Sequence, residues 1–481
     1  MKIVHISAEC YPAAKAGGLG DVVGALPKYL NQLGEDASVI LPYYHNEWLK
    51  NAETDLLFEG RAPFGPDSFA YRVGKLTKPD LGFDLFLIDI PGRFDRPGIY
   101  IDPWSGYAYW DEKERFMSYQ IAALEWLTQQ EKVPDVIHAH DHHTALVPFM
   151  TSQSFRYTKF KDTPVVLTIH NGEYQGRYDM ASYSLLPAFN LENIGLLDWD
   201  GALNALAAGI KTAWKVTTVS EGYMDELIEY CHGLEILLKD EQEKTAGILN
   251  GIDNEVWDPA TDDYLSVNYS HKNFKKGKSD NKKELCKQFD LDPEKPLFSF
   301  IGRLVREKGA DLIPALIENC KTRGIEANFL VLGTGDPNLH SVFENLSSKY
   351  VGYFNSRLEY NEGLAHKIYA GSDFILMPSR VEPCGLNQLY SMRYGTIPVV
   401  RKTGGLADTV IDISEEDGYG LVFNNFDEVE ATDTIERGVE LFNKKQFFNR
   451  VRKTIMTLDF SWKKAAKDYV SLYKSLTNKA L

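Results

Sequence analysis

Glycine and a cation occur together early in this sequence, in the run 15–21 (KAGGLGD). The run follows a short apolar strand pattern, Ile3–Ile6, and opens a helical one. Glycine lets the backbone approach a ligand closely, and the free N–H groups at a helix start favour negative charge. Lys15 adds a mobile cation that suits a phosphate. For a single such run, the alternative is an ordinary strand-to-helix turn that needs glycine for a positive φ.

Two later runs have the same character. The run 301–309 (IGRLVREKG) follows a strand pattern and contains Arg303 and Lys308, which can reach a diphosphate from one loop. Thr403 and Gly404 form a third strand-to-helix turn with a hydroxyl and a glycine. Ligands of parallel sheets bind at the carboxyl ends of the strands. The three runs therefore predict one phosphorylated ligand held between two halves of the chain.

Imidazole and carboxylate side chains supply further candidates. His170 and Asn171 end a strand pattern, where they can hydrogen-bond sugar hydroxyls. Glu382 lies in a turn after a buried strand pattern, where a carboxylate can bind two hydroxyls of a sugar. The alternative for Glu382 is a favourable interaction with the start of the helix predicted near Leu386.

The histidine-rich run 138–143 (HAHDHH) suggests a metal site. We discount this interpretation because strand alternation directs His138 and His140 to one face, whereas the residues that follow are expected to begin a helix. Asp141 is a good N-cap residue for that helix.

These residues need elements that position them, and strand and helix patterns alternate along the chain. Such alternation is typical of mostly parallel sheets and predicts an α/β fold with two doubly wound domains facing each other across a cleft. The join is expected near the turn 249–253. The predicted strands are 2–7, 37–41, 84–90, 135–139, 164–169 and 215–219 in the first half, and 297–301, 328–332, 374–377 and 397–400 in the second.

Two segments depart from this regular pattern. The polar and basic segment 271–283 (HKNFKKGKSDNKK) predicts a solvated surface loop. Pro27 lies inside the first helical pattern, so that helix is expected to kink or to start late.

Bulk properties exclude several classes of protein. A length of 481 residues predicts two or three domains. The net charge of −16 argues against a general nucleic-acid or anionic-membrane surface. The five scattered cysteines form no C-x-x-C pair, which favours reduced thiols over disulfides or a zinc site. The sequence shows neither a signal-peptide apolar region nor a run long enough to cross a bilayer, so we expect a cytoplasmic protein.

The run 15–22 (KAGGLGDV) resembles the K-x-G-G-L-x-D-V signature of bacterial glycogen synthases and plant starch synthases. The resemblance extends along almost the whole chain, and so many ordered motifs are very improbable by chance. The other matching motifs, in the expected order, are 138–146 (HAHDHHTAL), 170–171 (HN), 218–220 (TVS), 248–253 (ILNGID), 301–304 with 308–309, 378–386 (PSRVEPCGL) and 401–410 (RKTGGLADTV).

The resemblance implies a GT-B fold with two Rossmann-like domains. Residues 1–247 are expected to form the acceptor-side domain, and residues 248–461 the domain that binds the nucleotide sugar. The last helix, 462–481, is expected to return to the first domain, and the aromatic and apolar residues from Phe460 to Tyr473 recur at helical spacing.

The resemblance also implies the reaction. Glucose passes from ADP-glucose to the 4-OH at the non-reducing end of an α-1,4-glucan such as glycogen, with retention at the anomeric carbon. No metal and no other cofactor is expected. The leaving phosphate is expected to deprotonate the acceptor hydroxyl, so no enzyme base is assigned.

Site roles follow by the same resemblance. Arg303 and Lys308 are expected to neutralise the leaving diphosphate, which stabilises the transition state more than the ground state. Glu382 is expected to bind glucose hydroxyls, and His170 the glucose 6-OH, as the other catalytic residues. The expected acceptor-binding residues are Asp141 and Asp21. The expected donor-binding residues are Lys15, Gly18, Asn171, Tyr360, Cys384, Gly385, Leu386, Thr403 and Gly404.

Two positions differ from the wider pattern. Tyr390 stands where many retaining GT-B enzymes have the second glutamate of E-x7-E, a replacement that is common in the synthase branch. Glu173 stands where a small or apolar residue is expected, and a carboxylate there bears on donor or acceptor preference.

Several other functions share parts of the pattern. An NAD(P)-dependent oxidoreductase is disfavoured because the first glycines miss G-x-G-x-x-G by one residue. A glucan phosphorylase would need a lysine-bound pyridoxal phosphate. A catalytically inactive glucan-binding protein would not need a diphosphate clamp, and a sucrose- or trehalose-forming transferase fits the motifs less well. UDP-glucose remains an alternative donor, because ADP-glucose rests on the resemblance alone.

Overall fold

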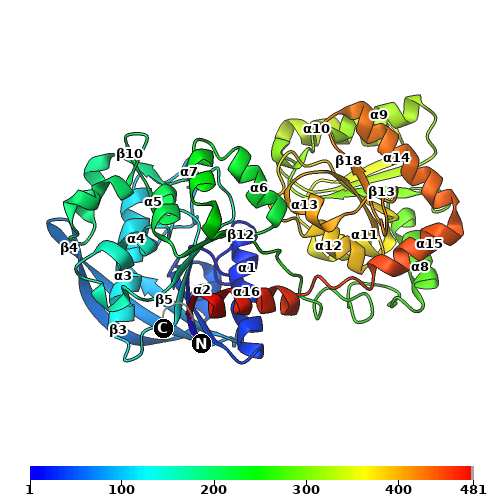
Figure 1. The fold of residues 1–481 in the computed structure, drawn as a ribbon. Coiled ribbons are helices and arrows are strands. Elements are labelled where there is room, and N and C mark those ends of the chain that lie inside the picture. The colour runs from blue at the N-terminus through cyan, green and yellow to red at the C-terminus, as the bar shows by residue number, and fades with distance from the viewer. Residues whose placement is uncertain (478–481) are drawn as a thin grey trace. The chain divides into compact units, whose positions relative to one another are not determined.

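The computed structural model describes residues 1–477, which form two compact units (Figure 1). Unit 1 contains Met1–Val219, Met224–Ile248 and the segment from Trp462 onward, and unit 2 contains Ser220–Tyr223 and Leu249–Ser461. Each unit is a mainly parallel sheet with helices packed on it, so the predicted α/β class is confirmed. Among the described residues, no helix is both long and apolar enough to span a membrane.

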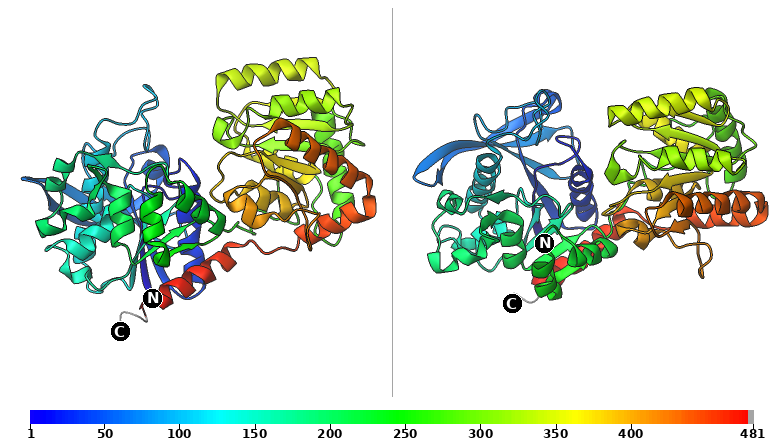
Figure 2. Two further views of the ribbon diagram at one scale, coloured as in Figure 1. Left: turned by 45° about the horizontal axis from the view of Figure 1, so that its top comes forward. Right: turned by 90° about the horizontal axis from the view of Figure 1, so that it is seen from above.

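The main sheet of unit 1 has the strand order β12-β11-β7-β6-β1-β2-β5-β4-β3. Neighbours from β12 to β5 run parallel, and β3 and β4 add a long antiparallel hairpin at one edge, drawn in blue in Figure 2. Its strands are β1 (Lys2–Ile6), β2 (Asp36–Pro42), β3 (Glu53–Phe64), β4 (Asp67–Lys78), β5 (Asp84–Asp89), β6 (Val136–His140), β7 (Val165–Ile169), β11 (Lys215–Thr218) and β12 (Thr245–Gly247). A small separate sheet contains β8 (Arg177–Tyr178), β9 (Asp198–Trp199) and β10 (Ala202–Asn204).

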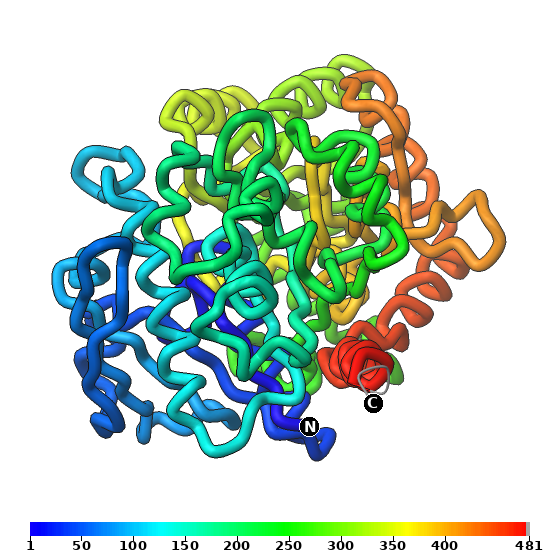
Figure 3. The backbone as a smooth tube through the Cα atoms, turned by 60° about the vertical axis from the view of Figure 1, so that its left-hand side comes forward, coloured from blue at the N-terminus to red at the C-terminus, as the bar shows by residue number. Residues whose placement is uncertain are grey.

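Two helices from opposite ends of the chain share one face of this sheet. Helices α1 (Gly18–Gln32) and α16 (Trp462–Thr477) lie side by side and pack over Ile3, Val136 and Val166 (Figures 1 and 3). The helical spacing predicted for the C-terminal segment is confirmed. The other helices of the first half are α2 (Glu47–Asn51), α3 (Glu112–Thr128), α4 (Leu146–Gln153), α5 (Ala205–Thr212), α6 (Glu221–Glu229) and α7 (Glu235–Asp240), with 3-10 turns at Thr158–Phe160, Met180–Leu185, Leu191–Leu196 and Gln242–Lys244.

The sheet of unit 2 is entirely parallel, in the order β15-β14-β13-β16-β17-β18. In chain order this is 3-2-1-4-5-6, the order of a Rossmann fold. Its strands are β13 (Leu297–Ile301), β14 (Asn328–Leu332), β15 (Phe354–Arg357), β16 (Phe374–Met377), β17 (Ile397–Arg401) and β18 (Leu421–Phe423).

Helices cover both faces of that sheet. Successive residues of β13 serve opposite faces: Leu297 packs with α8 and α11, and Phe298 packs in the cluster of α9, α10, α14 and α15. The helices are α8 (Phe274–Gln288), α9 (Ile313–Thr322), α10 (Pro337–Lys349), α11 (Glu362–Gly371), α12 (Asn387–Arg393), α13 (Gly404–Thr409), α14 (Glu428–Asn443) and α15 (Lys445–Ile455), with a 3-10 turn at Arg306–Lys308.

All the strands predicted from the sequence are present, and their ends differ by at most one residue. The hairpin of β3 and β4 was not predicted, because most of its side chains are exposed or half-buried and give no strong apolar alternation. The short strands β12, β15 and β18 were also missed.

Of the two outcomes expected from Pro27, a kink or a late start of the helix, the late start is wrong. The helix begins at Gly18 and continues through Pro27 to Gln32. A proline has no N–H for the carbonyl four residues earlier, which here belongs to Val23. The Cys10 thiol donates to that carbonyl across 3.6 Å, so the carbonyl has a partner in place of the missing helical bond.

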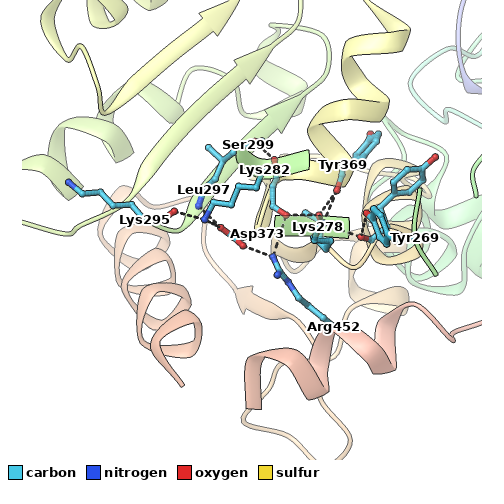
Figure 4. A network of polar contacts seen from close by, with 12 residues as sticks. Tyr269, Lys278, Lys282, Lys295, Leu297, Ser299, Tyr369, Asp373 and Arg452 are labelled. Carbon is cyan, nitrogen blue, oxygen red and sulfur yellow. Dashed lines mark hydrogen bonds and ion pairs between the residues drawn. The ribbon is translucent and has the colours of Figure 1, made fainter. Parts of the chain in front are cut away.

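The prediction of a solvated loop at 271–283 is wrong, because most of this segment belongs to α8 and two of its lysines, Lys278 and Lys282, are buried. The Lys278 ammonium is buried and donates to the carbonyls of Tyr369 and Tyr394, at 3.1 and 3.0 Å, and to Thr396 Oγ1 at 2.7 Å (Figure 4). Three acceptors from α11 and from the turn between α12 and β17 surround this ammonium, and no local feature of the sequence indicates them.

A second buried cation of α8 pairs with a carboxylate. Lys282 Nζ lies 2.7 Å from Asp373 Oδ2, and Arg452 of α15 bonds the other oxygen of the same carboxylate (Figure 4). Burial alone would raise the pKa of Asp373, but the two cations outweigh burial and hold that pKa below its ordinary value. This ion cluster joins α8 and α15 to the start of β16.

Candidate active site

The predicted site residues of unit 1 follow three neighbouring strands of the main sheet, in the order β7-β6-β1. The glycine run follows β1, Asp141 follows β6, and His170 and Asn171 follow β7. After β1 the chain builds the sheet toward β2 and β5, and from β6 onward it builds toward β12. The carboxyl ends of β1 and β6 therefore mark a topological switch point, where open α/β sheets bind ligands.

The first two glycines of the run, Gly17 and Gly18, lack the positive φ for which an ordinary turn would need glycine. Gly17 is the N-cap of α1 with extended backbone, and neither Gly17 nor Gly18 has a positive φ. A Cβ atom at either position would meet no atom within 4 Å. Neither backbone strain nor packing therefore explains the missing side chains, and the turn alternative fails. Lys15 Nζ lies 2.7 Å from Asp21 Oδ1 beside this helix start.

Glu9 is a part of this loop that the sequence analysis missed. Its buried carboxylate accepts hydrogen bonds from the N–H groups of Ala16 and Gly17, at 2.6 and 2.8 Å, through Oε2. Its Oε1 accepts from the Tyr100 hydroxyl at 2.7 Å. The backbone N–H groups of this loop thus already bind an anionic group of the same chain. A single acidic residue after a strand gave no specific signal.

Asp141 does not cap a helix, which corrects the sequence-based expectation. Helix α4 begins only at Leu146, and Asp141 has a positive φ of 56°. Its Oδ1 accepts from the backbone N–H of His170 at 2.6 Å and of Asn171 at 3.4 Å. Burial raises the pKa of Asp141 to about 7. The side chain therefore ties the end of β6 to the end of β7.

Three histidines form a hydrogen-bonded chain near the carboxyl ends of β1, β6 and β7. His170 Nε2 lies 3.1 Å from His140 Nδ1, and His140 Nε2 lies 3.0 Å from His5 Nδ1. Each such contact needs one N–H and one lone pair, so the three tautomers are coupled. Burial lowers the pKa of His170 and of His5 to about 3, which keeps both rings neutral near pH 7. Within the described residues, Nδ1 is the ring nitrogen of His170 left for a ligand.

His138 shares the face of His140, as strand alternation predicted, and the two rings stack with centroids 4.2 Å apart. Its Nδ1 bonds the Tyr473 hydroxyl of α16 at 2.7 Å, and its Nε2 bonds Thr168 Oγ1 at 2.6 Å. His5, His138 and His140 have candidate ligand atoms within 4.8 Å of one another. Five of their six ring nitrogens already have a hydrogen-bond partner in the described structure, so a metal would have to displace these bonds.

The predicted residues of unit 2 also gather at a switch point, between the carboxyl ends of β13 and β16. Lys308, after β13, places Nζ 2.7 Å from Oε1 of Glu382, after β16. Ser379 Oγ donates to the other oxygen of Glu382 at 2.9 Å. Burial alone would lower the pKa of Lys308, but the Glu382 carboxylate raises it above its ordinary value, so the ammonium stays charged. Two residues predicted separately from the sequence thus form one ion pair.

Two glycines make this pairing possible through close backbone approach. Gly309 has a positive φ of 69°, and a Cβ atom there would lie 2.0 Å from the Pro378 carbonyl oxygen. A Cβ atom at Gly405 would lie 2.1 Å from the Cys384 carbonyl oxygen, while the Gly405 N–H donates to the Glu382 carbonyl at 3.0 Å. The loop after β13 and the start of α13 therefore both pack closely against the loop that contains Glu382.

Arg303 lies in the same loop as Lys308, with its side chain 65% exposed. Its guanidinium is 3.5 Å from Glu307 Oε2, and Lys308 Nζ is 3.5 Å from Glu307 Oε1. Glu307 thus stands between the two cations, a partner that the sequence analysis missed. An exposed guanidinium held this loosely can turn toward an incoming phosphate at little cost.

The loop after Glu382 supplies three predicted donor-binding residues. Cys384 is buried, and burial raises the pKa of its thiol to about 12, so it is protonated near pH 7 and is no nucleophile. Gly385 has a positive φ of 73°, which glycine adopts without strain. Leu386 is the N-cap residue of α12.

The remaining predicted residues differ in how the fold places them. Thr403, buried and with extended backbone, is the N-cap of α13, which begins at Gly404. Tyr360 is 80% exposed and follows β15, two strands from β13 on the side away from β16, so the sheet order does not bring it beside Glu382. Tyr390 stacks on Trp257 with centroids 3.9 Å apart.

Family models match both units of the chain. The model described as the starch synthase catalytic domain matches residues 2–240, and the model described as glycosyl transferases group 1 matches residues 281–446.

Full-length relatives agree with these matches. The chain is 47% identical to a glycogen synthase of Flavobacterium johnsoniae, over 98% of both chains, and 37% identical to a glycogen synthase of Streptococcus uberis, over 99% of both. Among solved structures, the catalytic domain of Arabidopsis thaliana starch synthase IV, bound to ADP and acarbose, superposes with a TM-score of 0.86 at 33% identity, covering 99% of each chain. A sucrose-phosphate synthase of Thermosynechococcus elongatus, at a TM-score of 0.60 and 17% identity over 99% of both chains, shares the fold. The chain therefore belongs to the glycogen and starch synthase family of GT-B glycosyltransferases.

Proposed function

We propose that this glycosyltransferase passes glucose from ADP-glucose to the 4-OH at the non-reducing end of an α-1,4-glucan, with retention at the anomeric carbon. The observation that carries the proposal is the full-length 47% identity to a glycogen synthase. The ADP bound to the related starch synthase IV supports an adenine nucleotide as the leaving group.

In unit 2, the proposed task of Arg303 and Lys308 is to stabilise the diphosphate as it leaves. Charge aimed at a leaving group lowers the barrier because the interaction strengthens in the transition state. Lys308 now neutralises Glu382 at 2.7 Å. In the proposed complex, the lysine turns its charge to the diphosphate and the Glu382 carboxylate accepts hydroxyls of the glucose.

The other donor-binding roles in unit 2 rest on position in the fold. We assign the distal phosphate to Thr403 and Gly404, at the start of α13. The loop of Cys384, Gly385 and Leu386 would line the donor beside Glu382. Tyr360 would stack on the adenine from the loop after β15, with β14 between that strand and β13.

In unit 1, a neutral His170 would bind the glucose 6-OH through Nδ1, since Nε2 is held by His140. Asn171 would contact the same sugar. Lys15 and Gly18 at the start of α1 would face the phosphates, where the helix N-terminus favours negative charge. Asp141 and Asp21 are the proposed contacts of the acceptor.

We propose no enzyme base, no metal and no other cofactor for the transfer. The acceptor hydroxyl would lose its proton to an oxygen of the departing phosphate as the new glycosidic bond forms on the same face of the sugar. The neutral His170 and the protonated Cys384 thiol are both poor bases near pH 7, which is consistent with this assignment.

The direct test is glucose transfer to glycogen from ADP-glucose and, in parallel, from UDP-glucose, both with EDTA present. We expect the higher rate with ADP-glucose and no loss of rate with EDTA. A preference for UDP-glucose would move the donor assignment and keep the reaction. Transfer from neither donor would overturn the proposal, and Glu173 would be the first position to substitute.

A further inference from the structure

Three large aromatic side chains of unit 1, in the segment between β5 and α3, are highly exposed to solvent. Trp104, Tyr107 and Trp110 are 83%, 77% and 87% exposed. Among the described residues only two other large hydrophobic side chains are exposed to 77% or more. Scattered apolar side chains are normal on a protein surface, but a cluster of this kind marks an interaction site.

The segment is ordered by its own hydrogen bonds. Ile101 and Ala108 pair as an antiparallel bridge, the Asp102 N–H donates to the Tyr107 carbonyl at 2.9 Å, and the Gly106 N–H donates to the Asp102 carbonyl at 2.8 Å. Residues 100–109 therefore form a short hairpin, and we call this hairpin with Trp110 the aromatic hairpin. It projects from unit 1 as a light-blue loop in Figures 2 and 3.

One carboxylate holds the tip of the aromatic hairpin. Asp102 accepts the N–H of Trp104 through Oδ1 at 3.0 Å and the hydroxyl of Ser105 through Oδ2 at 3.1 Å. Fixing the backbone before a ligand arrives reduces the entropy lost on binding. The backbone that carries the rings at the tip is thus fixed before a ligand arrives.

The base of the aromatic hairpin is clamped by cations. The Tyr109 ring has the guanidinium groups of Arg96 and Arg115 at 4.9 and 4.7 Å from its centroid. Arg96 also forms a bidentate pair with the buried Asp111, at 2.5 and 2.7 Å. The half-buried Tyr109 is therefore held by two cations, while the neighbouring aromatic side chains are exposed.

The base also connects to the candidate site of unit 1. Tyr100 donates to Glu9, which binds the backbone of the glycine run, and its ring stacks on His143 with centroids 4.6 Å apart. His143 is two residues from Asp141. The displayed aromatics are thus continuous with residues that we assign to the donor and the acceptor.

We propose that the aromatic hairpin is a docking surface for a neutral α-glucan chain. The flat indole and phenol rings match the apolar faces of glucose rings, and the hydroxyl of Tyr107 and the N–H groups of Trp104 and Trp110 suit the hydroxyls at the sugar edge. The net charge of −16 and the acidic Asp102 disfavour nucleic acid and anionic lipid as occupants. The identity of the ligand rests on the proposed function, whereas the presence of a docking surface does not.

The test is co-sedimentation with glycogen without any nucleotide sugar, comparing the wild-type chain with Trp104→Ala/Trp110→Ala. Truncation of buried interface aromatics typically weakens binding about tenfold each, so we expect at least about a tenfold higher Kd for the double variant. Its melting temperature should stay unchanged because both side chains are exposed. Phe155→Ala, which removes an aromatic ring that is 65% exposed elsewhere on unit 1, is the matched control and should bind like the wild type.

Three results would overturn the proposal: an unchanged Kd in the double variant, an equal loss in Phe155→Ala, or a change of oligomeric state that shows a second copy of the chain as the occupant. A further variant, Asp102→Ala, keeps the rings but frees the tip, and an intermediate Kd is expected. Binding without turnover would refute the proposed function and keep the docking surface, and turnover with undiminished binding in the double variant would do the reverse.

Discussion

At the scale of single residues, the Lys308–Glu382 pair shows how a ligand site can be stable while empty. Each side chain alone would be a largely buried charge, and an uncompensated buried charge costs several kcal/mol. Paired at 2.7 Å, the two neutralise each other until a diphosphate and a sugar replace them as partners. Arg303 needs no such partner because water solvates its exposed guanidinium.

The diphosphate assignment predicts a loss of turnover without a matching loss of stability. Arg303→Ala should lower kcat by about a hundredfold, as removal of a charge aimed at the transition state does. Its melting temperature should hardly move, because exposed ion pairs contribute little. Lys308→Ala should lower kcat as much and also cost some stability by stranding Glu382. Initial rates with glycogen and thermal melts check both. Arg306→Ala in the same loop is the control, and wild-type turnover in both test variants would remove the assignment.

Asp141 predicts a stability change that depends on pH. Its pKa is about 7 when folded and near 4 when unfolded, so the folded chain holds the proton more tightly and loses stability as pH rises from about 4 to about 7. The loss, of the order of 2–4 kcal/mol, is complete above pH 7. Asp141→Asn should therefore melt higher than the wild type at pH 8, and the difference should shrink toward pH 5.

The matched control for this variant is Asp417→Asn. Asp417 is exposed and has a similar positive φ of 60°, so it separates the preference of asparagine for this backbone conformation from the charge effect. A pH-independent difference at Asp141, or an equal gain at Asp417, would contradict the interpretation.

At the scale of elements, α8 shows why a lysine-rich segment need not be solvated. Two of its lysines, Lys278 and Lys282, point into the unit, where Lys278 bonds carbonyls and Lys282 pairs with a carboxylate. The long apolar stems add packing area, and the ammonium groups end on fixed acceptors. The outcome depends on partners more than ninety residues away, from α11 to the turn before β17.

Removing the carboxylate of this cluster should destabilise unit 2. Asp373→Asn leaves Lys282 and Arg452 buried without a negative partner, which typically costs about 3–5 kcal/mol. Since the folded pKa of Asp373 is depressed, its contribution in the wild type is present above the unfolded pKa near 4 and is lost as pH falls through the folded value. Thermal melts from pH 8 down to pH 3 measure both effects.

The control at this scale is Asp433→Asn, which removes an exposed partner of Arg323. Exposed pairs contribute up to about 1 kcal/mol, so this variant should melt close to the wild type. If the two aspartate variants melted alike, the cluster around Asp373 would not be the stabilising feature that its burial implies.

At the scale of the whole molecule, unit 1 is completed by the end of the chain. Trp462 and Tyr473 of α16 pack into the same apolar cluster as Ile3 of β1. The Tyr473 hydroxyl bonds His138, a separation of 335 residues. The first strand and the last helix therefore form one folding unit, although a whole second unit lies between them in the sequence.

Loss of a single hydroxyl should reveal this dependence. Tyr473→Phe leaves Nδ1 of the fully buried His138 without a partner, which costs about 1–3 kcal/mol. Tyr230→Phe removes a similar hydroxyl–imidazole contact from the exposed pair with His232 and should have almost no effect. Melting temperatures of the two variants give the comparison, and equal values would show that α16 contributes only by packing.

The sequence by itself determined the strongly apolar strands, the loops that follow them and the residue types at their ends. Apolar runs bounded by glycine report burial and turns locally, so β13 and its loop were placed within one residue. The glycine run, Lys308 and Glu382 could be identified as candidates because strand ends in parallel sheets face ligands. The exposed hairpin of β3 and β4 was not predicted, because its side chains show no apolar pattern that indicates burial.

Only the tertiary structure decided which of these residues meet. The Lys308–Glu382 pair spans 74 residues, and the contact of Glu9 with the glycine run requires the loop after β1 to fold back on itself. The same holds for the acceptors of Lys278, which bury one lysine of a helix where a solvated loop was predicted. A local pattern records whether a side chain is buried or exposed, whereas its partner is set by the order of strands in the sheet, which depends on the packing of the whole unit.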